Sequence, residues 1–312
     1  MRPKHKTALV TVGQGYGNIV MATPLMAAAG AMDYAVNVLV ESHHADAATL
    51  LSGWDALNAI YLNRATLRHA RAYHPYDAVV RTVWNRGAPL GLGPEVSPDD
   101  LSLAAHHETD VNMTAARRLG FSGKEIPSAH VETELPFWPL PDRFMAVAPG
   151  YGGAARGDWA RKAWPHWPEF VERLHAESKG KILILGTGDD EAPWMTDEDK
   201  TWLHNLCGRT SIRGAAGVLS RCEGVVALDN GLAHVAAALG RPTTVLFGPT
   251  SEIKNAPRGR DVTVVAPDLP CRPCQMTDRW NACADWRCMA AIAPGDVLAS
   301  MRLQEGKIPC GT

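Results

Sequence analysis

Residues 224–250 read GVVALDNGLAHVAAALGRPTTVLFGPT, and this stretch decides the fold. Its first part, residues 225–228, is a short apolar run that indicates a strand buried on both faces. An alanine-rich helix is expected over residues 232–239, and residues 243–247 return to strand. A helix that opens directly after a buried parallel strand points its first N–H groups at the carboxyl edge of the sheet, where they favour phosphate. The stretch therefore predicts an anion site in an α/β protein.

The length and charge of the chain narrow the class of protein. Its 312 residues are enough for two domains with separate cores. The formal net charge of −2 offers no overall field that recruits nucleic acid. The amino-terminal residues lack the apolar run and cleavage site of a signal peptide, and no apolar run is long enough for a membrane span. We therefore expect a cytoplasmic protein that can work beside a membrane surface.

The first half of the chain alternates between strand and helix patterns, which argues for a mostly parallel sheet. The glycine-rich residues 13–18 follow the first strand. They lack the third glycine of the dinucleotide fingerprint, so a nicotinamide cofactor is disfavoured. Strands are expected at residues 7–12, 36–40, 59–62 and 76–81, and helices at 19–29, 45–51 and 111–119.

A proline-rich segment, residues 136–141 (PFWPLP), marks a domain boundary, because three prolines in six residues interrupt both helices and central strands. A second α/β pattern begins directly after it. It comprises strands at residues 144–148 and 181–185 and a helix at 165–177. The sequence therefore predicts an amino-terminal domain at residues 1–138 and a carboxy-terminal domain at residues 139–312, with a cleft between them.

Several motifs in this order resemble glycosyltransferase family 9, the family of ADP-heptose–lipopolysaccharide heptosyltransferases. The fairly specific element is Asp229-Asn230-Gly231-x-x-His234 followed by Phe-Gly-Pro-Thr. The resemblance implies a GT-B fold, in which two Rossmann-like domains face each other. The other matching pieces are Gly17-Asn18-Ile-Val with Thr-Pro-Leu, Lys162-Ala-Trp-Pro, and Leu185-Gly186 followed by Glu191.

The resemblance also implies a nucleotide-sugar donor, with ADP-heptose as the expected sugar nucleotide, bound by the second domain. Asp229 is expected to face the donor sugar, although an aspartate there can also cap the following helix. His234 is expected to donate to phosphate or to the motif's own backbone. Lys162 is expected to contact phosphate or ribose, and Glu191 is expected to contact ribose. The backbone at residues 230–232, including Asn230 and Gly231, and the loop 149–153 with Gly150 are expected to contact the diphosphate. Gly17 is a further expected donor-binding residue. Arg156 and Arg161 are expected to be solvated or flexible, with assistance from one of them as the alternative.

Asn18 occupies the position where the family has an aspartate that is proposed to deprotonate the acceptor. An amide has no basic lone pair, so Asn18 can orient an acceptor hydroxyl but cannot act as a general base. His107, Glu108 and Asp110 are the alternative candidates for that base, because they begin the helix at 111–119. Otherwise the chain binds a donor without transferring it, or Asn18 is itself an introduced substitution.

Four of the seven cysteines fall within residues 271–288: Cys271, Cys274, Cys283 and Cys288. A CxxC start followed by two more cysteines suits a tetrahedral metal site, and similar clusters occur in protein-directed heptosyltransferases with an iron finger. Spacing does not choose between zinc and iron. We expect a structural Zn or Fe site here, with free thiols or disulfides as the alternatives.

Together these features predict an inverting, metal-independent glycosyltransferase that moves a sugar, expected to be heptose, to a hydroxyl of a glycolipid, a glycan or a protein. Asn18, Glu108, Lys162 and Asp229 are the predicted catalytic residues. Two other functions stay open: a catalytically silent nucleotide-sugar-binding protein, and a sugar-nucleotide epimerase.

Overall fold

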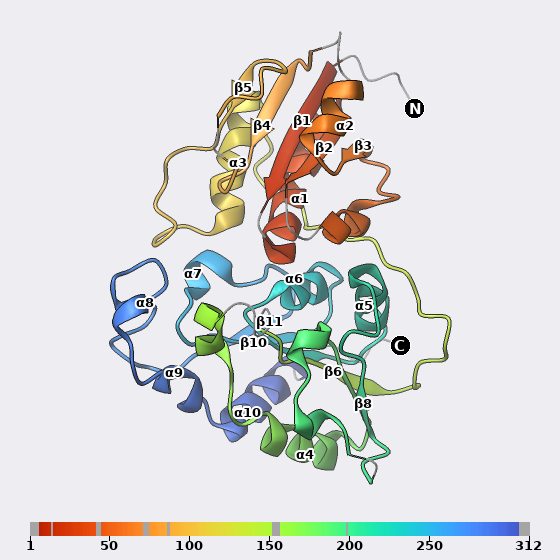
Figure 1. The fold of residues 1–312 in the computed structure, drawn as a ribbon, viewed down its shortest axis with the longest axis vertical. Coiled ribbons are helices and arrows are strands. Elements are labelled where there is room, and N and C mark those ends of the chain that lie inside the picture. Colours follow the sequence, from red (N-terminus) through yellow and green to blue (C-terminus); the bar gives the residue numbers. More distant parts are fainter. Residues whose placement is uncertain are drawn as a thin grey trace. The chain divides into compact units, whose positions relative to one another are not determined.

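The computed structural model describes residues 6–13, 15–41, 45–70, 75–85, 88–151, 157–197 and 199–305. The chain divides into two compact units, between Glu132 and Thr133. Each unit contains its own parallel sheet with helices packed beside it (Figure 1). We call them the amino-terminal and the carboxy-terminal unit.

The sheet of the amino-terminal unit has the order β3-β2-β1-β4-β5, with every neighbouring pair parallel. The strand β1 is central and pairs along its whole length with β2, from Lys6 beside Tyr34 to Gly13 beside Glu41. The strands are β1 (Lys6–Gly13), β2 (Tyr34–Glu41), β3 (Leu57–Tyr61), β4 (Ala78–Arg81) and β5 (Glu95–Val96). The helices are α1 (Tyr16–Ala31), the 3₁₀ helix η1 (Ala45–Leu51), α2 (Arg64–Ala70) and α3 (Glu108–Leu119).

Alternation along β1 explains how this sheet is covered on both faces. Ala8, Val10 and Val12 pack with buried residues of α1, η1 and α3. Leu9 points the other way and packs with Leu67 of α2. The glycine that ends α3, Gly120, has φ 115°, the left-handed conformation that such a cap requires.

The sheet of the carboxy-terminal unit has the order β11-β10-β9-β6-β7-β8 and is also parallel throughout. Its strands are β6 (Phe144–Ala148), β7 (Lys181–Ile184), β8 (Leu203–Asn205), β9 (Val225–Leu228), β10 (Thr243–Leu246) and β11 (Val262–Val265). Its helices are the 3₁₀ helices η2 (Gly157–Lys162), η3 (Gly188–Asp190) and η4 (Pro193–Met195), and α4 (Trp167–Ser178), α5 (Ile212–Leu219), α6 (Gly231–Ala238), α7 (Glu252–Asn255), α8 (Arg279–Ala282), α9 (Arg287–Ala290) and α10 (Pro294–Glu305).

A core rich in tryptophan and aliphatic side chains lies between this sheet and the helices α4 and α10. Phe170 of α4 is fully buried and packs with Ile184 of β7 and Val297 of α10. The helices α5 and α6 pack against each other, and α6 lies on β9 and β10. The central strands β6, β9 and β10 are buried along their whole length, as the apolar run at residues 225–228 predicts for β9, whereas the edge strands β8 and β11 are partly exposed.

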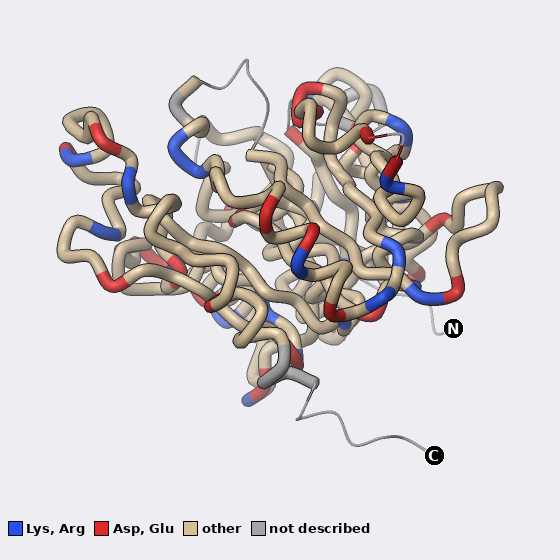
Figure 2. Tube along the Cα trace, turned by 90° about the horizontal axis from the view of Figure 1, so that it is seen from below, with Lys and Arg blue, Asp and Glu red and all other residues tan. Residues whose placement is uncertain are grey.

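Acidic and basic side chains are interspersed along the chain (Figure 2), in keeping with the net charge of −2. No helix within the described ranges has the length and the apolar character needed to cross a bilayer.

The predicted α/β class with two parallel sheets is confirmed. The strand expected at residues 225–228 is β9. The helix expected at 19–29 begins earlier, at Tyr16, so Gly17 and Asn18 lie in its first turn rather than in a loop. The segment expected as a helix at residues 45–51 is a 3₁₀ helix.

Candidate functional site

Each sheet has one point where the chain crosses from one side of its first strand to the other. In the amino-terminal unit this point lies between β1 and β4, and in the carboxy-terminal unit it lies between β6 and β9. In open α/β sheets, ligands bind beyond the carboxyl ends of the strands at such a switch point. The residues that follow these four strands are therefore the first candidates for a site.

Asn230 joins the two strands at the switch point of the carboxy-terminal unit. Its Oδ1 accepts a hydrogen bond from the Ala233 amide at 3.1 Å, which makes Asn230 the N-cap of α6. Its Nδ2 donates to the carbonyl oxygens of Ala148 at 3.0 Å and Gly150 at 2.8 Å, just after β6. The cap is therefore Asn230 and not Asp229, because the helix begins at Gly231.

Asp229 and Lys162 form a buried pair beside this cap. Lys162 Nζ donates to the Asp229 carbonyl oxygen and lies 3.7 Å from its Oδ2. Asn255 Nδ2, from α7, lies 3.4 Å from the same Oδ2. Because both charged side chains are about nine-tenths buried, their field is screened less by water than that of a surface pair.

The Lys162 ammonium also lies 4.8 Å from the ring centroid of Trp159, within cation–π range. Both residues belong to η2, so this short helix presents the lysine to the end of β9. Sequence reasoning predicted the lysine but not the aromatic ring beneath it.

Gly150 lies against Asp190, and a Cβ at Gly150 would meet Asp190 Oδ2 at 2.4 Å. Asp190 is held in turn by the Thr187 amide and hydroxyl, each at 2.8 Å. Only glycine fits at this position unless Asp190 moves. The rest of the predicted diphosphate loop, with Arg156, lies outside the described residues.

The other predicted donor contacts lie near the same edge of the sheet. Glu191 is exposed after η3, and its Oε1 accepts from Asn205 Nδ2 at 3.3 Å. Gly231 is the first residue of α6, and His234 is a buried residue of the same helix. Within one unit, polar contacts at the β6–β9 switch point join Asn230 to Gly150 and Lys162 to Asp229, while Gly231 and His234 lie on the adjoining helix α6 and Glu191 lies after β7.

Asn18 and Glu108 meet at the switch point of the amino-terminal unit. Asn18 Nδ2 donates to both carboxylate oxygens of Glu108, each at 2.9 Å, and Trp84 Nε1 donates to Oε2 at 2.6 Å. Asn18 Oδ1 accepts from the Gly15 amide at 3.0 Å, which fixes the amide at the start of α1. Asn18 follows β1 and Trp84 follows β4, so the Glu108 carboxylate, only 1% exposed as a residue, connects both strand ends.

The two other candidates for the base have different surroundings. The ring Nδ1 of His107 accepts from the Thr109 amide at 3.1 Å and so caps α3. Asp110 lies in the first turn of α3, where an acidic side chain complements the helix dipole. Gly17 lies in the first turn of α1. Of the three acid–base candidates, Glu108 is the one that is hydrogen-bonded to Asn18.

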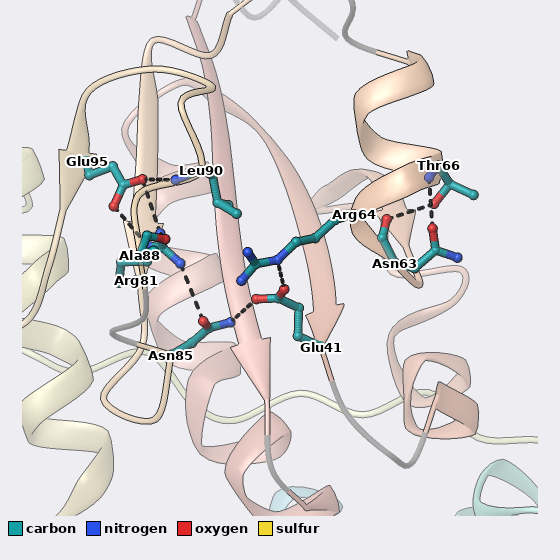
Figure 3. Close-up of polar contacts among 9 residues, drawn as sticks. All are labelled: Glu41, Asn63, Arg64, Thr66, Arg81, Asn85, Ala88, Leu90 and Glu95. Atoms are coloured by element: carbon teal, nitrogen blue, oxygen red, sulfur yellow. Dashed lines mark hydrogen bonds and ion pairs between the residues drawn. The ribbon is translucent and has the colours of Figure 1, made fainter.

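A chain of charged and amide side chains crosses the carboxyl edge of the same sheet (Figure 3). Arg81, 1% exposed, donates to both carboxylate oxygens of Glu95, at 3.0 and 3.1 Å. Asn85 links Arg81 to Glu41, and Glu41 pairs with Arg64. Burial acts to raise the pKa of Glu41, but hydrogen bonds from Arg64 and Asn85 outweigh it and lower that pKa below its ordinary value. This network holds the segments after β2 and β4 in place at the edge where Asn18 and Trp84 lie.

The predicted four-cysteine metal site is not supported. Across the ranges that the structure describes, no three His, Cys, Asp or Glu side chains are grouped as a metal ion requires. Cys271 and Cys283 are exposed free thiols, whereas Cys274 and Cys288 are buried free thiols. The cysteines are neighbours, since burial and then the nearby Cys283 and Cys271 raise the pKa of Cys274, but the side chains are not grouped closely enough to support a metal site.

Other contacts hold the cysteine-bearing segment instead. Arg272 makes a two-pronged ion pair with Glu252, at 2.8 and 3.2 Å, and its Nε donates to the Gly248 carbonyl at 3.0 Å. The Cys274 and Gln275 amides both donate to the Pro249 carbonyl at 3.0 Å. The segment is thereby fastened to the Phe-Gly-Pro-Thr turn that follows β10.

Arg161, expected to be solvated, is enclosed by tryptophans of the same segment. Its guanidinium carbon lies 5.0 Å from the Trp280 ring centroid and 5.6 Å from that of Trp286. Trp159 meets Trp280 edge to face at 5.3 Å. The expectation for Arg161 is therefore wrong, because two aromatic faces attract its cation.

Residues 99–284 match the family model for glycosyltransferase family 9 (heptosyltransferase), which is more than half of the chain. The chain belongs to glycosyltransferase family 9. The matched residues include Glu108 and every predicted donor residue except Gly17.

Two curated relatives align with part of this family 9 chain. Lipopolysaccharide heptosyltransferase 2 of Salmonella typhimurium is 33% identical over 111 residues, covering 33% of this chain and 32% of the relative. Lipopolysaccharide heptosyltransferase 1 of Pseudomonas aeruginosa is 36% identical over 120 residues, covering 37% and 33%. The alignments thus span about a third of the length of these relatives.

Among solved structures, the ADP-heptose lps heptosyltransferase II of E. coli has a similar fold over nearly all of both chains. The TM-score is 0.73 at 19% identity, with 96% of this chain and 98% of that chain covered. At this identity the similarity shows the fold, and the predicted pair of Rossmann-like domains of the GT-B class is confirmed.

Three residues around these sites carried no signal in the sequence. Trp84 and Asn255 each lie in short segments without a motif, and Trp159 precedes the Lys162 motif without belonging to it. Strand order accounts for the placement of Trp84 and Asn255, since it brings together the ends of β1 and β4 and of β9 and β10, and Trp159 lies in η2 after β6, the neighbour of β9.

Proposed function

We propose that this chain is a glycosyltransferase that transfers heptose from ADP-heptose to a hydroxyl group of a lipopolysaccharide core. The observation that carries the proposal is the cluster of Lys162, Asp229 and Asn230 at the β6–β9 switch point. Membership of family 9 and the printed names of the relatives support the choice of donor and acceptor.

The chemistry of the cluster suits the release of a diphosphate. Negative charge develops on the diphosphate as the bond to the sugar breaks, and a fixed cation and helix N–H groups stabilise that charge. Lys162 supplies the cation, held in place by Asp229. The first turn of α6, beginning at Gly231, supplies the N–H groups. This combination needs no metal ion for the transfer step, so we propose a metal-independent reaction.

The remaining donor contacts follow from position. We assign Asp229 to the hydroxyls of the donor sugar, Glu191 to the ribose and His234 to the phosphate side. Gly150 allows the backbone after β6 to approach the diphosphate. We also assign Gly17, at the start of α1, to donor binding, and we propose that transfer occurs with inversion in a cytoplasmic enzyme.

A silent nucleotide-sugar-binding protein is the second candidate, and one observation favours it. Asn18 replaces the aspartate expected as the base, and an amide accepts no proton at neutral pH. Such a protein binds ADP-heptose but releases no ADP when an acceptor is present.

The test measures binding and release with the same protein. Titration calorimetry with ADP-heptose and with GDP-, UDP- and dTDP-sugars gives the donor preference. ADP release is then followed with lipopolysaccharide cores that lack heptose or carry one heptose. We expect the tightest binding for ADP-heptose and ADP release that depends on the core. Binding without release identifies the silent protein, and no preference for ADP-heptose contradicts the proposal.

Two lysine variants test the site itself. Lys162→Met keeps most of the side-chain stem but removes the charge. Loss of a charged hydrogen bond of about 1.5–3 kcal/mol corresponds to roughly 10- to 100-fold weaker ADP binding. Lys200→Met is the matched control. Lys200 also lies over a tryptophan ring and pairs with carboxylates, but it precedes strand β8 and is not part of the proposed site. Equal ADP affinity in the two variants counts against the site.

A further inference from the structure

We infer that Glu108 is the catalytic base of the acceptor side, and that Asn18 and Trp84 are its positioning residues. This inference rests on the proposed transfer reaction. It assigns the negative charge missing from position 18 to a residue on a different helix.

The geometry carries the assignment. The Glu108 carboxylate receives N–H groups from Asn18 at 2.9 Å and from Trp84 at 2.6 Å, so its orientation is fixed from two strand ends. It lies at the switch point of its sheet, where open α/β sheets bind ligands. The Thr109 hydroxyl donates to the Met21 carbonyl at 3.3 Å, which ties the start of α3 to α1 beside the pair.

The pair explains why an amide rather than a carboxylate stands at position 18. An aspartate there would place a second carboxylate about 3 Å from the first, and two such groups cannot both be ionised. Asn18 instead donates to the Glu108 carboxylate. The asparagine at position 18 therefore fits the carboxylate at position 108. In the proposed site the acidic side chain lies on α3, and the amide lies on α1.

The step that follows balances in atoms and charge. The acceptor O–H bond breaks and its proton goes to a Glu108 carboxylate oxygen, while the acceptor oxygen forms a bond to the anomeric carbon. The bond from that carbon to the diphosphate breaks, and the electron pair leaves with the diphosphate oxygen. Asn18 Nδ2 is shared between Oε1 and Oε2, so in the proposed step it stays on Oε2 while the acceptor hydroxyl takes Oε1. Glu108 is only 1% exposed, so this step requires the side chains that cover it to move aside.

Four variants of the full chain test the inference, with ADP-heptose as donor and the two lipopolysaccharide cores as acceptors. For Glu108→Gln we expect kcat to fall about 100-fold or more, the range of a lost general base, with the Kd for ADP within about twofold of wild type. For Asn18→Asp we expect a decrease in kcat rather than a gain. For the double variant Asn18→Asp/Glu108→Gln, which returns one carboxylate and one amide to the pair, we expect kcat at least about tenfold above Glu108→Gln.

Asp99→Asn is the control, because Asp99 pairs at the surface with Arg118, which lies on α3, the helix that carries Glu108. It loses a carboxylate near α3 without touching the pair, and its kcat should match wild type. The rescue by the double variant separates a charge requirement from a folding defect. Wild-type rates in Glu108→Gln, a higher kcat in Asn18→Asp, or a double variant no faster than Glu108→Gln each overturn the inference. A wild-type chain that binds no ADP-heptose contradicts the proposed function instead.

Discussion

The side-chain nitrogen Nδ2 of Asn18 donates hydrogen bonds to both carboxylate oxygens of Glu108, at 2.9 Å each, although the two residues are 90 positions apart. The contact joins the first turn of α1 to the first residue of α3. Asn18 cannot act as a base itself, but it forms a hydrogen-bonded pair with the Glu108 carboxylate. The proposed role of Glu108 as the base therefore depends on a contact between two helices rather than on a single motif.

Trp84→Phe tests how strongly this pair is held. The variant removes the Nε1–H that donates to Glu108 Oε2 at 2.6 Å and keeps most of the ring. A hydrogen bond to a buried charge contributes about 1.5–3 kcal/mol, so we expect the free energy of unfolding to fall by that amount in urea titrations. Trp54→Phe is the control in the same unit, where the indole stacks on His130. Equal losses in the two variants would show that the Trp84 hydrogen bond contributes little.

Asn230 can be tested by separating its two hydrogen-bonding roles. Asn230→Asp keeps an oxygen that caps α6 but loses the N–H groups that reach Ala148 and Gly150, and it adds a negative charge. Asn230→Ala loses the cap as well, which costs about 1 kcal/mol of stability. We expect ADP affinity in calorimetry to decrease from wild type to Asn230→Ala to Asn230→Asp. A stronger affinity in Asn230→Asp than in Asn230→Ala would place the diphosphate elsewhere.

Gly217→Ala tests the packing of α5 against the segment that enters the carboxy-terminal unit. A Cβ at Gly217 would lie 1.9 Å from the Glu134 carbonyl oxygen, a backbone atom. Overpacking of this kind costs about 1–3 kcal/mol, so we expect a lower melting temperature. Gly295→Ala in α10 is the control, since its Cβ meets only Arg173 Nη2, at an ordinary 3.5 Å. A melting temperature of Gly217→Ala at or above that of Gly295→Ala contradicts the packing.

Glu41→Gln tests the charged network of the amino-terminal unit. The folded pKa of Glu41 is lowered from 4.5, so its contribution to stability is present above that value and is lost as pH falls through the folded pKa. Replacing the ionised partner of Arg64 and Asn85 should cost about 1–3 kcal/mol at pH 7. We expect the difference in unfolding free energy between wild type and variant to shrink as pH falls below 4.5. A difference that is constant with pH would mean that the network does not depend on the Glu41 charge.

Thiol labelling distinguishes free cysteines from a metal cluster. Cys271 and Cys283 are exposed, so they should react first with iodoacetamide at pH 8. Burial raises the pKa of Cys207 and of Cys222 to about 12, so these two thiols should react slowly and serve as internal references. Peptide mass spectrometry measures the order. Protection of Cys271 and Cys283 to the level of Cys207 would favour a bound metal.

The sequence was sufficient for the repeated α/β pattern. Buried parallel strands such as β9 are continuous apolar runs, and the turn residues 229–231 mark the start of α6. Helices with little apolar patterning or few residues, such as α2 and α7, gave no comparable signal. The motif of Asp229 and Asn230 marked the β6–β9 switch point, but the alternative of a cap at Asp229 was wrong, because Asn230 caps α6.

The cluster of Asn18, Trp84 and Glu108 could be predicted only in part, because its contacts join segments that are distant in the chain. Glu108 was one of three candidates at the start of α3, and only the fold shows that its carboxylate meets Asn18 and Trp84. The cysteine spacing suggested a metal, which the arrangement of the described side chains does not support, because spacing alone does not set how closely the thiols gather. In the structure Arg272 and the tryptophans around Arg161 hold that segment.

The central claim is that this family 9 chain moves heptose from ADP-heptose by way of the Lys162 and Asp229 site. Mass spectrometry of a lipopolysaccharide core after incubation with ADP-heptose tests it most directly. The account predicts that wild type adds one heptosyl residue to the core, and that Lys162→Met adds it far more slowly than Lys200→Met. A core that stays unmodified while the protein binds ADP-heptose would contradict the account.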